Sequence, residues 1–578
     1  MTKTPQFDAE IGKILENLSP SMRVCKSCGT QFQIYEEDIR FYRSLLIPPP
    51  TLCPLCRKKR RMAHLMRVPK FFKKECNAEG HSESLVSVYP KESPHKVYDT
   101  PYWFSDEWDA EDYCREYDIE KDFFSQFKEL FFDVPRIPID RDLTATNCDY
   151  SVGGKHGKNL YYCGGGYRSE DCMYDMNTRF SKSCIDSTNV WHSELCSNCV
   201  DAEKCSNCIY VHNSSNCLDS AFLYDSRNCS HCFMSSNLRN KSYVFQNQQL
   251  SREEYKKRIE SVNTGNREEL EVYISKFNDL LTRAVRRAVT NTNTANSAGD
   301  KLTNCKDCFF AFDGTNGENL RYTNGFDSLR DVMDVSFSAE NTEKCYECII
   351  ALGSGMKSCM FVRSSMDLEY CSDCHNSKYC FGCVGLRNKE YCIFNKKYSE
   401  DEYWKKVDEI KTRMLQDGTY GEFFDVSLNL IPYQSSNAEY YWPLSEKERK
   451  EKGVMWYEES GINIPEGMET LVPGKDKEFL DIKNVGDDIL QKAIICKKTK
   501  KPFRVIESEL QLLRKLNIPL PTKHPWERIM ERKVYEHDID LYPFTCPSCR
   551  KNTHSVYNET KQKEYKIFCE ECYNKEVV

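Results

Sequence analysis

Seven cysteines in the middle of the chain recur at regular intervals, and this spacing restricts the fold more than any other feature of the sequence. Consecutive members are separated by 9 or 12 residues, and the pattern closes on itself every 33 residues. A fixed period of this kind indicates a repeat architecture, in which each structural unit stacks on the next. The seven are Cys163, Cys172, Cys184, Cys196, Cys205, Cys217 and Cys229.

A second cysteine array repeats part of the first. Six cysteines of the first array recur at an offset of 175 residues, which is too many matches for chance. The sequence therefore contains two related arrays, at roughly 144–247 and 302–396. The matched pairs are Cys184 and Cys359, Cys196 and Cys371, Cys199 and Cys374, Cys205 and Cys380, Cys208 and Cys383, and Cys217 and Cys392.

The two arrays also end alike. Both close with the phrase Leu-Arg-Asn-Lys-x-Tyr, repeated at an offset of 148, and each phrase leads to a serine that suits a helix N-cap, Ser251 or Ser399. Residues 252–298 then show the periodicity of helices and end in a polar loop at 290–297. An apolar stripe on these helices indicates core packing. It consists of Leu270, Ile274, Phe277, Leu281 and Val285.

Polar turn formers separate the cysteines within each array. Asn, Asp, Ser and Gly bond to their own backbone in turns, and strand-like segments such as 208–211 lie between them. Short strands joined by tight turns at a fixed period predict a β-solenoid, with the small cysteines stacked inward as a ladder. A metal site remains the alternative for the cysteine sets at 196–208 and 371–383, although their five-residue insert is short for a zinc hairpin.

A pair of Cys-x-x-Cys motifs stands near each end of the chain. Spacing of this kind lets four thiolates surround Zn²⁺ tetrahedrally, and a set of four cysteines leaves no open position for catalysis. The sequence therefore predicts two structural zinc sites. The ligands are Cys25, Cys28, Cys53 and Cys56 for the first site, and Cys546, Cys549, Cys569 and Cys572 for the second.

The N-terminal zinc module has a second copy near the C-terminus. At an offset of 471, residues 25–57 overlay residues 496–528 without gaps. Of the four ligand positions, only those of Cys496 and His524 keep a residue that could bind zinc, which is too few for a structural site. We therefore expect this copy to be free of metal.

The C-terminal zinc ribbon has a corresponding copy near the N-terminus. Residues 76–103 resemble 546–573 at an offset of about 470, but three of the cysteine positions hold Glu79, Asp99 and Tyr102. This copy is also predicted to be metal-free and held by packing of its aromatic residues. Each end would then carry one zinc, giving two ions in total.

Length, charge and cysteine content limit the class of protein. A chain of 578 residues should hold several domains, and a net charge of -7 provides no whole-molecule field for nucleic acid. The sequence has no basic-then-apolar signal segment and no apolar run long enough to span a membrane. We therefore expect a cytoplasmic protein whose 32 cysteines are reduced, serving as metal ligands or as small core residues.

The N-terminal module resembles the treble-clef zinc-ribbon family. The motif is carried by Cys25, Cys28, Gly29, Phe32, Asp38, Phe41, Tyr42, Pro50, Cys53, Pro54, Cys56 and Arg57. The whole layout resembles large zinc-ribbon, cysteine-repeat proteins of candidate-phylum bacteria, which implies zinc binding and a shared fold but no activity. A CaiB/BaiF coenzyme A-transferase label is sometimes attached to such proteins. This chain has neither a nucleotide-binding glycine loop nor a recognisable transferase aspartate.

Three functions are weighed. The first is a zinc-binding repeat scaffold that binds a protein or other macromolecular partner. The second is a nucleic-acid- or ribosome-associated protein that uses a basic stretch consisting of Arg57, Lys58, Lys59, Arg60, Arg61 and Arg67. The third is a thiol-redox or transferase enzyme, which the absence of any catalytic motif makes the weakest of the three.

The expected fold is mainly β with helical insertions, comprising two cysteine-rich β-solenoid arrays flanked by zinc-ribbon and treble-clef modules at both termini. The predicted divisions follow the motifs described above. They are a treble-clef module at 1–68, a metal-free ribbon at 69–118, the first array at 119–250, a helical connector at 251–300, the second array at 301–398, a helix and irregular region at 399–486, a metal-free treble-clef copy at 487–535 and a zinc ribbon at 536–578.

Overall fold

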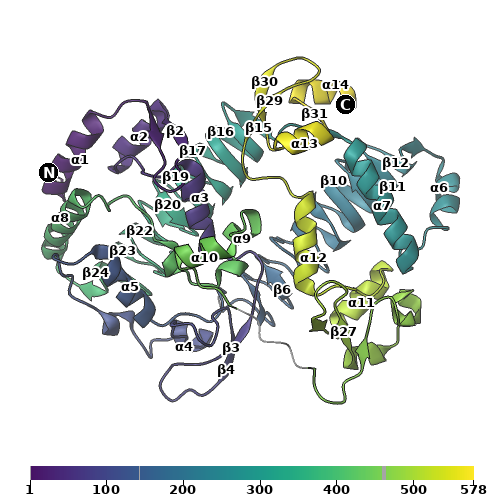
Figure 1. Ribbon diagram of the computed structural model, residues 1–578, viewed down its shortest axis with the longest axis horizontal. Helices are drawn as coiled ribbons and strands as arrows, with labels where there is room; N and C mark the ends of the chain where they lie inside the picture. Colours follow the sequence, from purple (N-terminus) through teal and green to yellow (C-terminus); the bar gives the residue numbers. More distant parts are fainter. Residues whose placement is uncertain (1, 142, 458–463, 578) are drawn as a thin grey trace.

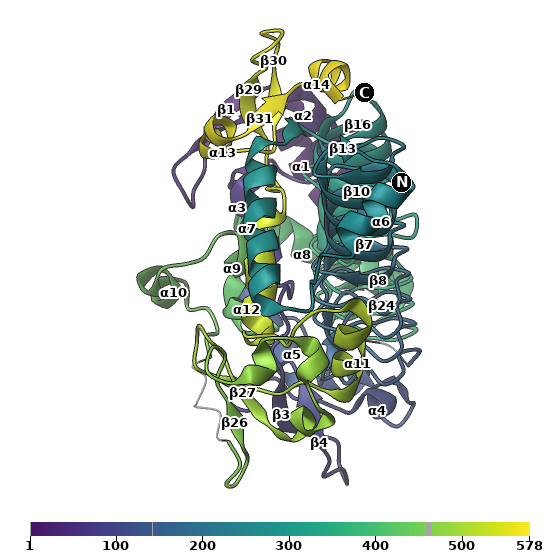
Figure 2. The same cartoon turned by 90° about the vertical axis from the view of Figure 1, so that its right-hand side faces the viewer.

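The computed structural model describes residues 2–141, 143–457 and 464–577, and the fold is mainly β with helices packed against it. Two arrays of parallel strands form one layer, and helices gather on one side of it (Figure 2). Among the described residues, no helix is both long enough and apolar enough to cross a membrane.

The first array occupies about 144–249. Its strands pair in parallel, and each residue lies beside the residue 12 positions later, as in the pairs Cys196 with Cys208 and Cys217 with Cys229. The strands are β5 (Tyr150–Val152), β6 (Tyr161–Gly164), β7 (Thr188–Trp191), β8 (Glu194–Ser197), β9 (Val200–Glu203), β10 (Ser206–Tyr224), β11 (Arg227–Ser236), β12 (Ser242–Phe245) and β13 (Gln248–Gln249).

The second array occupies about 292–397 and also pairs in parallel, except at its final hairpin. Strands β16, β17, β19 and β18 pair in a closed circuit. Cys380 pairs with Cys392, again 12 residues apart. The strands are β15 (Thr292–Ala295), β16 (Ala298–Thr315), β17 (Glu318–Arg321), β18 (Asn324–Asp327), β19 (Arg330–Ser338), β20 (Tyr346–Ile349), β21 (Gly353–Ser354), β22 (Ser365–Glu369), β23 (Lys378–Phe381), β24 (Glu390–Ile393) and β25 (Lys396–Lys397).

The backbone of both arrays turns at every third residue. Asn198, Asp201, Lys204 and Asn207 all have φ between 52° and 54° or close to it, at 51°, in the left-handed region. Asn and Asp tolerate this region better than other non-glycine residues, which explains their abundance here. Stacked corners also bond to each other, as where the Asn189 amide donates to Asp201 at 2.9 Å.

The residue that follows each corner faces inward. Cys199, Ala202, Cys205 and Cys208 occupy consecutive inward positions and are at most 1% exposed. Four such positions complete a turn of 12 residues, so only small side chains fit the narrow interior. Every cysteine from Cys148 to Cys392 is buried.

The duplicated modules near the two ends have the same element order, and their bounds agree closely at offsets of 471 and about 470. Leu46 and Asn517, which end the matching helices, both have a φ of 51°. The N-terminal elements are α1 (Pro5–Glu16), β1 (Ser21–Val24), β2 (Gln31–Ile34), α2 (Glu36–Leu45), α3 (Pro54–Ala63), β3 (Phe72–Glu75), β4 (Ser84–Ser87) and α4 (Thr100–Phe104). The C-terminal elements are β27 (Ala493–Ile495), β28 (Pro502–Phe503), α11 (Glu507–Leu516), α12 (Pro525–Arg532), β29 (Tyr542–Thr545), β30 (Asn552–Ser555), α13 (Glu559–Glu564), β31 (Lys566–Phe568) and α14 (Glu570–Val577).

The modules dock crosswise on the arrays. The N-terminal module packs on the second array, where Arg57 and Arg61 pair with Asp334 at 2.8 and 2.9 Å. The C-terminal copy packs on the first array, where its equivalents Arg528 and Arg532 pair with Asp186 at 2.6 and 3.2 Å. Asp186 and Asp334 are themselves 148 residues apart, so one contact is built twice. Figure 1 shows the two resulting lobes, one around α2, α3 and β19 and the other around α11, α12 and β10.

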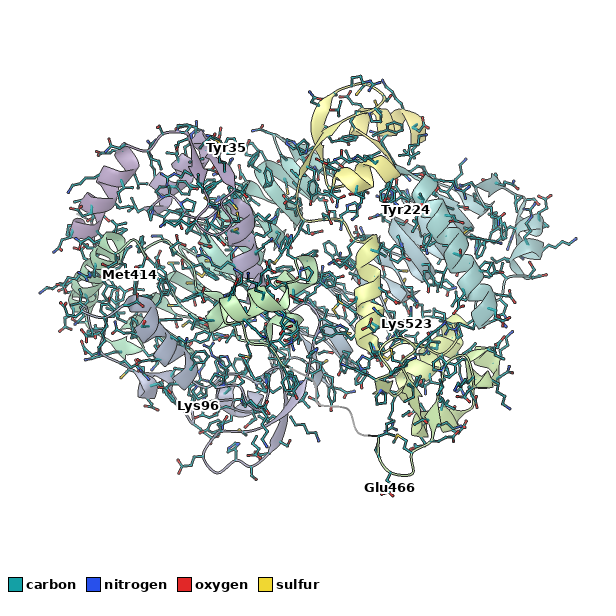
Figure 3. The ribbon with its side chains drawn as sticks, in the orientation of Figure 1. Tyr35, Lys96, Tyr224, Met414, Glu466 and Lys523 are labelled. Atoms are coloured by element: carbon teal, nitrogen blue, oxygen red, sulfur yellow. The ribbon has the colours of Figure 1, made fainter. Side chains whose placement is uncertain are left out.

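The helices that precede the arrays follow the same crosswise rule. Helix α5 (Phe123–Asp133) leads into the first array but packs on the second, with the rings of Phe123 and Tyr370 5.1 Å apart. Helix α7 (Arg267–Arg283) and β14 (Val285–Arg287) lead into the second array, but Phe277 packs against Phe222 of the first at 5.6 Å. Tyr224, labelled in Figure 3, lies between this array and the C-terminal ribbon.

The remaining elements follow the arrays or cover them. Ser251 and Ser399 cap the helices after the arrays, as the sequence predicts. These helices are α6 (Arg252–Ile259) and α8 (Glu400–Gln416), and the others are α9 (Asn437–Tyr441), α10 (Glu446–Lys452) and the short strand β26 (Thr470–Leu471).

Two local expectations were wrong. The predicted loop at 290–297 contains strand β15, because Asn293 and Asn296 are left-handed corners of the second array rather than residues of an irregular turn. The range predicted for the first array includes helix α5, whose aromatic residues face the other array. In both places a tertiary contact decides the local structure.

Candidate metal centres

The first four-cysteine cluster joins a hairpin to a helix. Cys25 and Cys28 lie in the turn between β1 and β2, where Gly29 adopts a φ of 71°. Cys53 is the N-cap of α3 and Cys56 lies in its first turn. The Sγ atoms of all four lie within 4.8 Å of one another, and those of Cys28 and Cys53 are 3.8 Å apart. Hydrogen bonding to Cys56 lowers the pKa of Cys53 to about 5, which favours the thiolate that a metal requires.

The second cluster is built the same way in the C-terminal ribbon. Cys546 and Cys549 lie in the turn between β29 and β30, and Cys569 and Cys572 lie at the start of α14. All four Sγ atoms again lie within 4.8 Å of one another, with Cys549 and Cys569 3.6 Å apart. Burial opposes ionisation, but backbone N–H groups at Cys549 and Cys569 lower the pKa of Cys546 to about 6.

Both clusters can hold a metal ion, and their composition selects its chemistry. Four thiolates in a compact set suit Zn²⁺ or an iron–sulfur cluster. A Zn²⁺ ion bound by four thiolates is coordinatively complete, so it would brace the fold rather than bind a substrate. In each module the ion would tie a turn to a helix whose side chains or neighbours contact an array.

The treble-clef copy near the C-terminus replaces the cluster with an ion pair. Glu527 stands at the position of Cys56, and its carboxylate pairs with Lys498 at 2.5 Å, on the equivalent turn. The buried Sγ of Cys496 accepts the backbone N–H of Thr499 at 3.4 Å. No group of three or more candidate ligands forms in this copy among the described residues.

The ribbon copy near the N-terminus differs from its expectation. Cys76, His81 and Asp99 bring their ligand atoms within 4.8 Å of one another. The described part of the chain therefore contains three candidate clusters, one more than the two predicted. His81 was missed because the comparison with the other ribbon was made position by position. A histidine five residues after a cysteine, near the end of the same turn, was the available signal.

The cysteine sets at 196–208 and 371–383 do not form compact clusters among the described residues. Their thiols point at backbone carbonyls instead, as Cys208 does toward Ser206 O at 3.3 Å and Cys217 O at 3.5 Å. A ring of carbonyl oxygens favours the protonated thiol over the thiolate. Burial likewise raises the pKa of Cys345 to about 12.

The predicted basic stretch is not a solvated surface. Arg57, Lys58, Arg61 and Arg67 are each at most 8% exposed. Their partners are internal, Asp334 for Arg57 and Arg61, Glu536 for Arg67 and the carbonyl of Ile539 for Lys58.

The two remaining members of the stretch are partly buried. Arg60 pairs with Glu347 at 2.7 Å and with Glu422 at 2.8 Å. The Lys59 Nζ lies 5.5 Å from the centre of the Trp442 ring. The acidic partners lie as far as about 480 residues away in sequence, so adjacent positions could not reveal them.

No protein-family model, curated protein or solved structure matches this chain in the comparisons made.

Proposed function

We propose that this chain is a zinc-binding repeat scaffold, in which two four-cysteine zinc sites fix the terminal modules against two β-solenoid arrays. The observation that carries the proposal is the assembly of eight thiols, far apart in sequence, into two compact tetrads. In the proposed fold, the modules have treble-clef and zinc-ribbon character, in keeping with their resemblance to those families. The arrays supply the extended surface that such repeat proteins use for recognition.

The partner is proposed to be a protein or another macromolecule. The uncovered side of the strand layer offers stacked polar corners, such as Asn207, whose amide donates to Asp219 at 2.7 Å (Figure 2). Residues Lys158, Glu170 and Lys182 form a further exposed column of paired charges, with distances of 3.1 and 3.3 Å. A mixed polar surface of this kind favours a specific protein contact over a polyanion.

The alternatives receive less support. Nucleic-acid binding through the stretch from Arg57 to Arg67 would require breaking its buried ion pairs. Thiol-redox chemistry needs accessible thiolates, whereas the array thiols are buried and bonded to carbonyls. We therefore propose a scaffold role in a reducing, cytoplasmic setting.

Metal analysis of the full chain, purified without added chelator, tests the zinc part of the proposal. We expect at least two tightly held zinc ions per chain, and one fewer in Cys28→Ser and in Cys549→Ser. These two exposed ligands are chosen because their replacement disturbs packing least. Cys114→Ser, at an exposed cysteine outside both clusters, is the control and should retain all the metal. A chain that retains its zinc after both tetrads are cut would contradict the proposal.

Native purification tests the partner. A stoichiometric protein partner that survives nuclease treatment supports the scaffold role. Co-purification that nuclease abolishes would favour the nucleic-acid alternative, and a monodisperse chain without any partner would contradict both.

A further inference from the structure

The ribbon copy near the N-terminus contains a mixed cluster of candidate ligands. The Sγ atom of Cys76 lies 3.8 Å from Asp99 Oδ2, and His81 Nδ1 lies 3.0 Å from the same oxygen. Ligand atoms around a tetrahedral Zn²⁺ lie roughly 3.3–3.8 Å apart, because the metal–ligand bonds are about 2.0–2.3 Å long. We propose that these three residues form a third metal site, which binds Zn²⁺ or a similar divalent transition cation and leaves its fourth position to solvent.

The backbone around this cluster reproduces that of the C-terminal zinc ribbon. The N–H of Cys76 donates to Glu83 O at 3.0 Å, as that of Cys546 donates to Lys551 O at 3.0 Å. Asp99 O accepts the N–H of Trp103 at 2.9 Å, the bond that Cys569 makes with Tyr573 at 2.9 Å. Cys76 and Asp99 therefore occupy two ligand positions of an intact zinc ribbon.

The turn that follows Cys76 explains how His81 joins them. Gly80, with a φ of 78°, corresponds to Arg550, with a φ of 63°, so both turns bend at the same place. The loop in the N-terminal copy is two residues longer, because its hairpin partner is Glu83 rather than the equivalent of Lys551. This extra length carries His81 back to the cluster, where its ring packs against Tyr102 at 4.7 Å.

The fourth position is open. Glu79, at the place of Cys549, is exposed, and Tyr102, at the place of Cys572, carries a phenol that is a poor ligand at neutral pH. The side chains of His81 and Asp99 are 28% and 21% exposed, so solvent reaches the cluster. Three protein ligands and one exchangeable position distinguish this site from the two closed tetrads, and we expect it to release its metal first.

Cobalt substitution of the full chain tests the site. We expect wild type to bind three equivalents of Co²⁺ and His81→Ala to bind two, with loss of the less intense single-thiolate absorption and retention of the four-thiolate bands. Azide should shift the visible bands of wild type but leave those of His81→Ala unchanged. His554→Ala, which removes an exposed histidine from the intact ribbon, is the matched control and should behave as wild type.

A second variant guards against misfolding. Cys76→Ser should also lose one equivalent and the azide response while keeping both four-thiolate signals. Wild type that binds only two equivalents, or a His81→Ala variant that still binds three, would overturn the third site. Loss of the four-thiolate bands from wild type would instead refute the two tetrads, so the two proposals fail separately.

Discussion

Cys208 shows why cysteine fills the interior of the arrays. Its side chain is fully buried, pairs in register with Cys196 and donates to the carbonyls of Ser206 and Cys217. Serine fills other inward positions in the same way, as where Ser193 Oγ donates to Trp191 O at 2.9 Å. The site thus requires a small side chain with one hydrogen to donate.

Two substitutions of Cys208 should separate size from chemistry. Cys208→Ser keeps the volume and the donor, so we expect it to lower the free energy of unfolding by about 1 kcal/mol or less. Cys208→Leu adds atoms to a closed interior and should cost about 1–3 kcal/mol or more. Urea unfolding measures both. Loss of bound zinc from Cys208→Ser would instead show that the set at 196–208 holds metal.

A buried histidine should make stability depend on pH. His212 packs against Phe277 and Tyr535, its Nε2 lies 3.1 Å from Asn198 O, and burial lowers its pKa to about 4. The unfolded chain, with a His pKa of about 6.5, takes up the proton first as the pH falls. The stability that neutral His212 provides is therefore present above pH 6.5 and is lost between 6.5 and 4, by an amount on the order of 2–3 kcal/mol.

Comparison with His212→Phe isolates this contribution. The nearest charged groups that influence His212 are Asp201, which raises its pKa, and Arg286, which lowers it. Urea unfolding of both proteins at pH 7, 5.5 and 4.5 should show the wild type losing stability faster than the variant. Parallel curves would show that His212 is not held neutral.

At the scale of elements, one docking contact is used twice. Asp334 receives Arg57 and Arg61 from α3, and its side chain is fully buried. The second copy uses Asp186 and α12 in the same way. A buried carboxylate shared by two guanidinium groups sets the position of each module, because a displaced module would leave unpaired charges in the interior.

Removing the shared carboxylate should therefore detach a module. Asp334→Asn leaves two buried cations without their counter-ion, and we expect a loss of about 3–5 kcal/mol in stability. Limited proteolysis should then cleave first within residues 2–141 rather than in the C-terminal modules. Asp331→Asn, at a partly exposed aspartate of the same array, should have little effect. Equal proteolysis of the two variants would contradict the docking role.

The duplication was visible in the sequence, but the crosswise docking was not. The offset of 471 predicts matching elements, and α2 and α11 match residue for residue. The docking contacts relate the arrays by 148 residues rather than by the cysteine fingerprint's 175. Both offsets keep inward residues inward because the backbone repeats every three residues, so the cysteines alone could not select the correct one.

At the scale of the whole molecule, sequence spacing located the two tetrads, while the partners of the basic stretch and the ligand His81 required the fold. Zinc spacing is local, whereas Arg57 and Asp334 lie 277 residues apart. The molecule joins two lobes through segments that each leave one array to pack on the other (Figure 1). We therefore expect the lobes to depend on each other for folding.

The account as a whole assigns each thiol to a place set by geometry, either in a metal cluster or in a buried ladder. Titration with a thiol reagent, under metal-loaded native conditions and again in denaturant with chelator, tests this most directly. In the native protein we expect one rapidly reacting thiol, the exposed Cys114, and all 32 in the unfolded chain without reductant. Fewer than 32 in the unfolded chain would reveal disulfides, and many rapid thiols in the native protein would show that the arrays do not bury them.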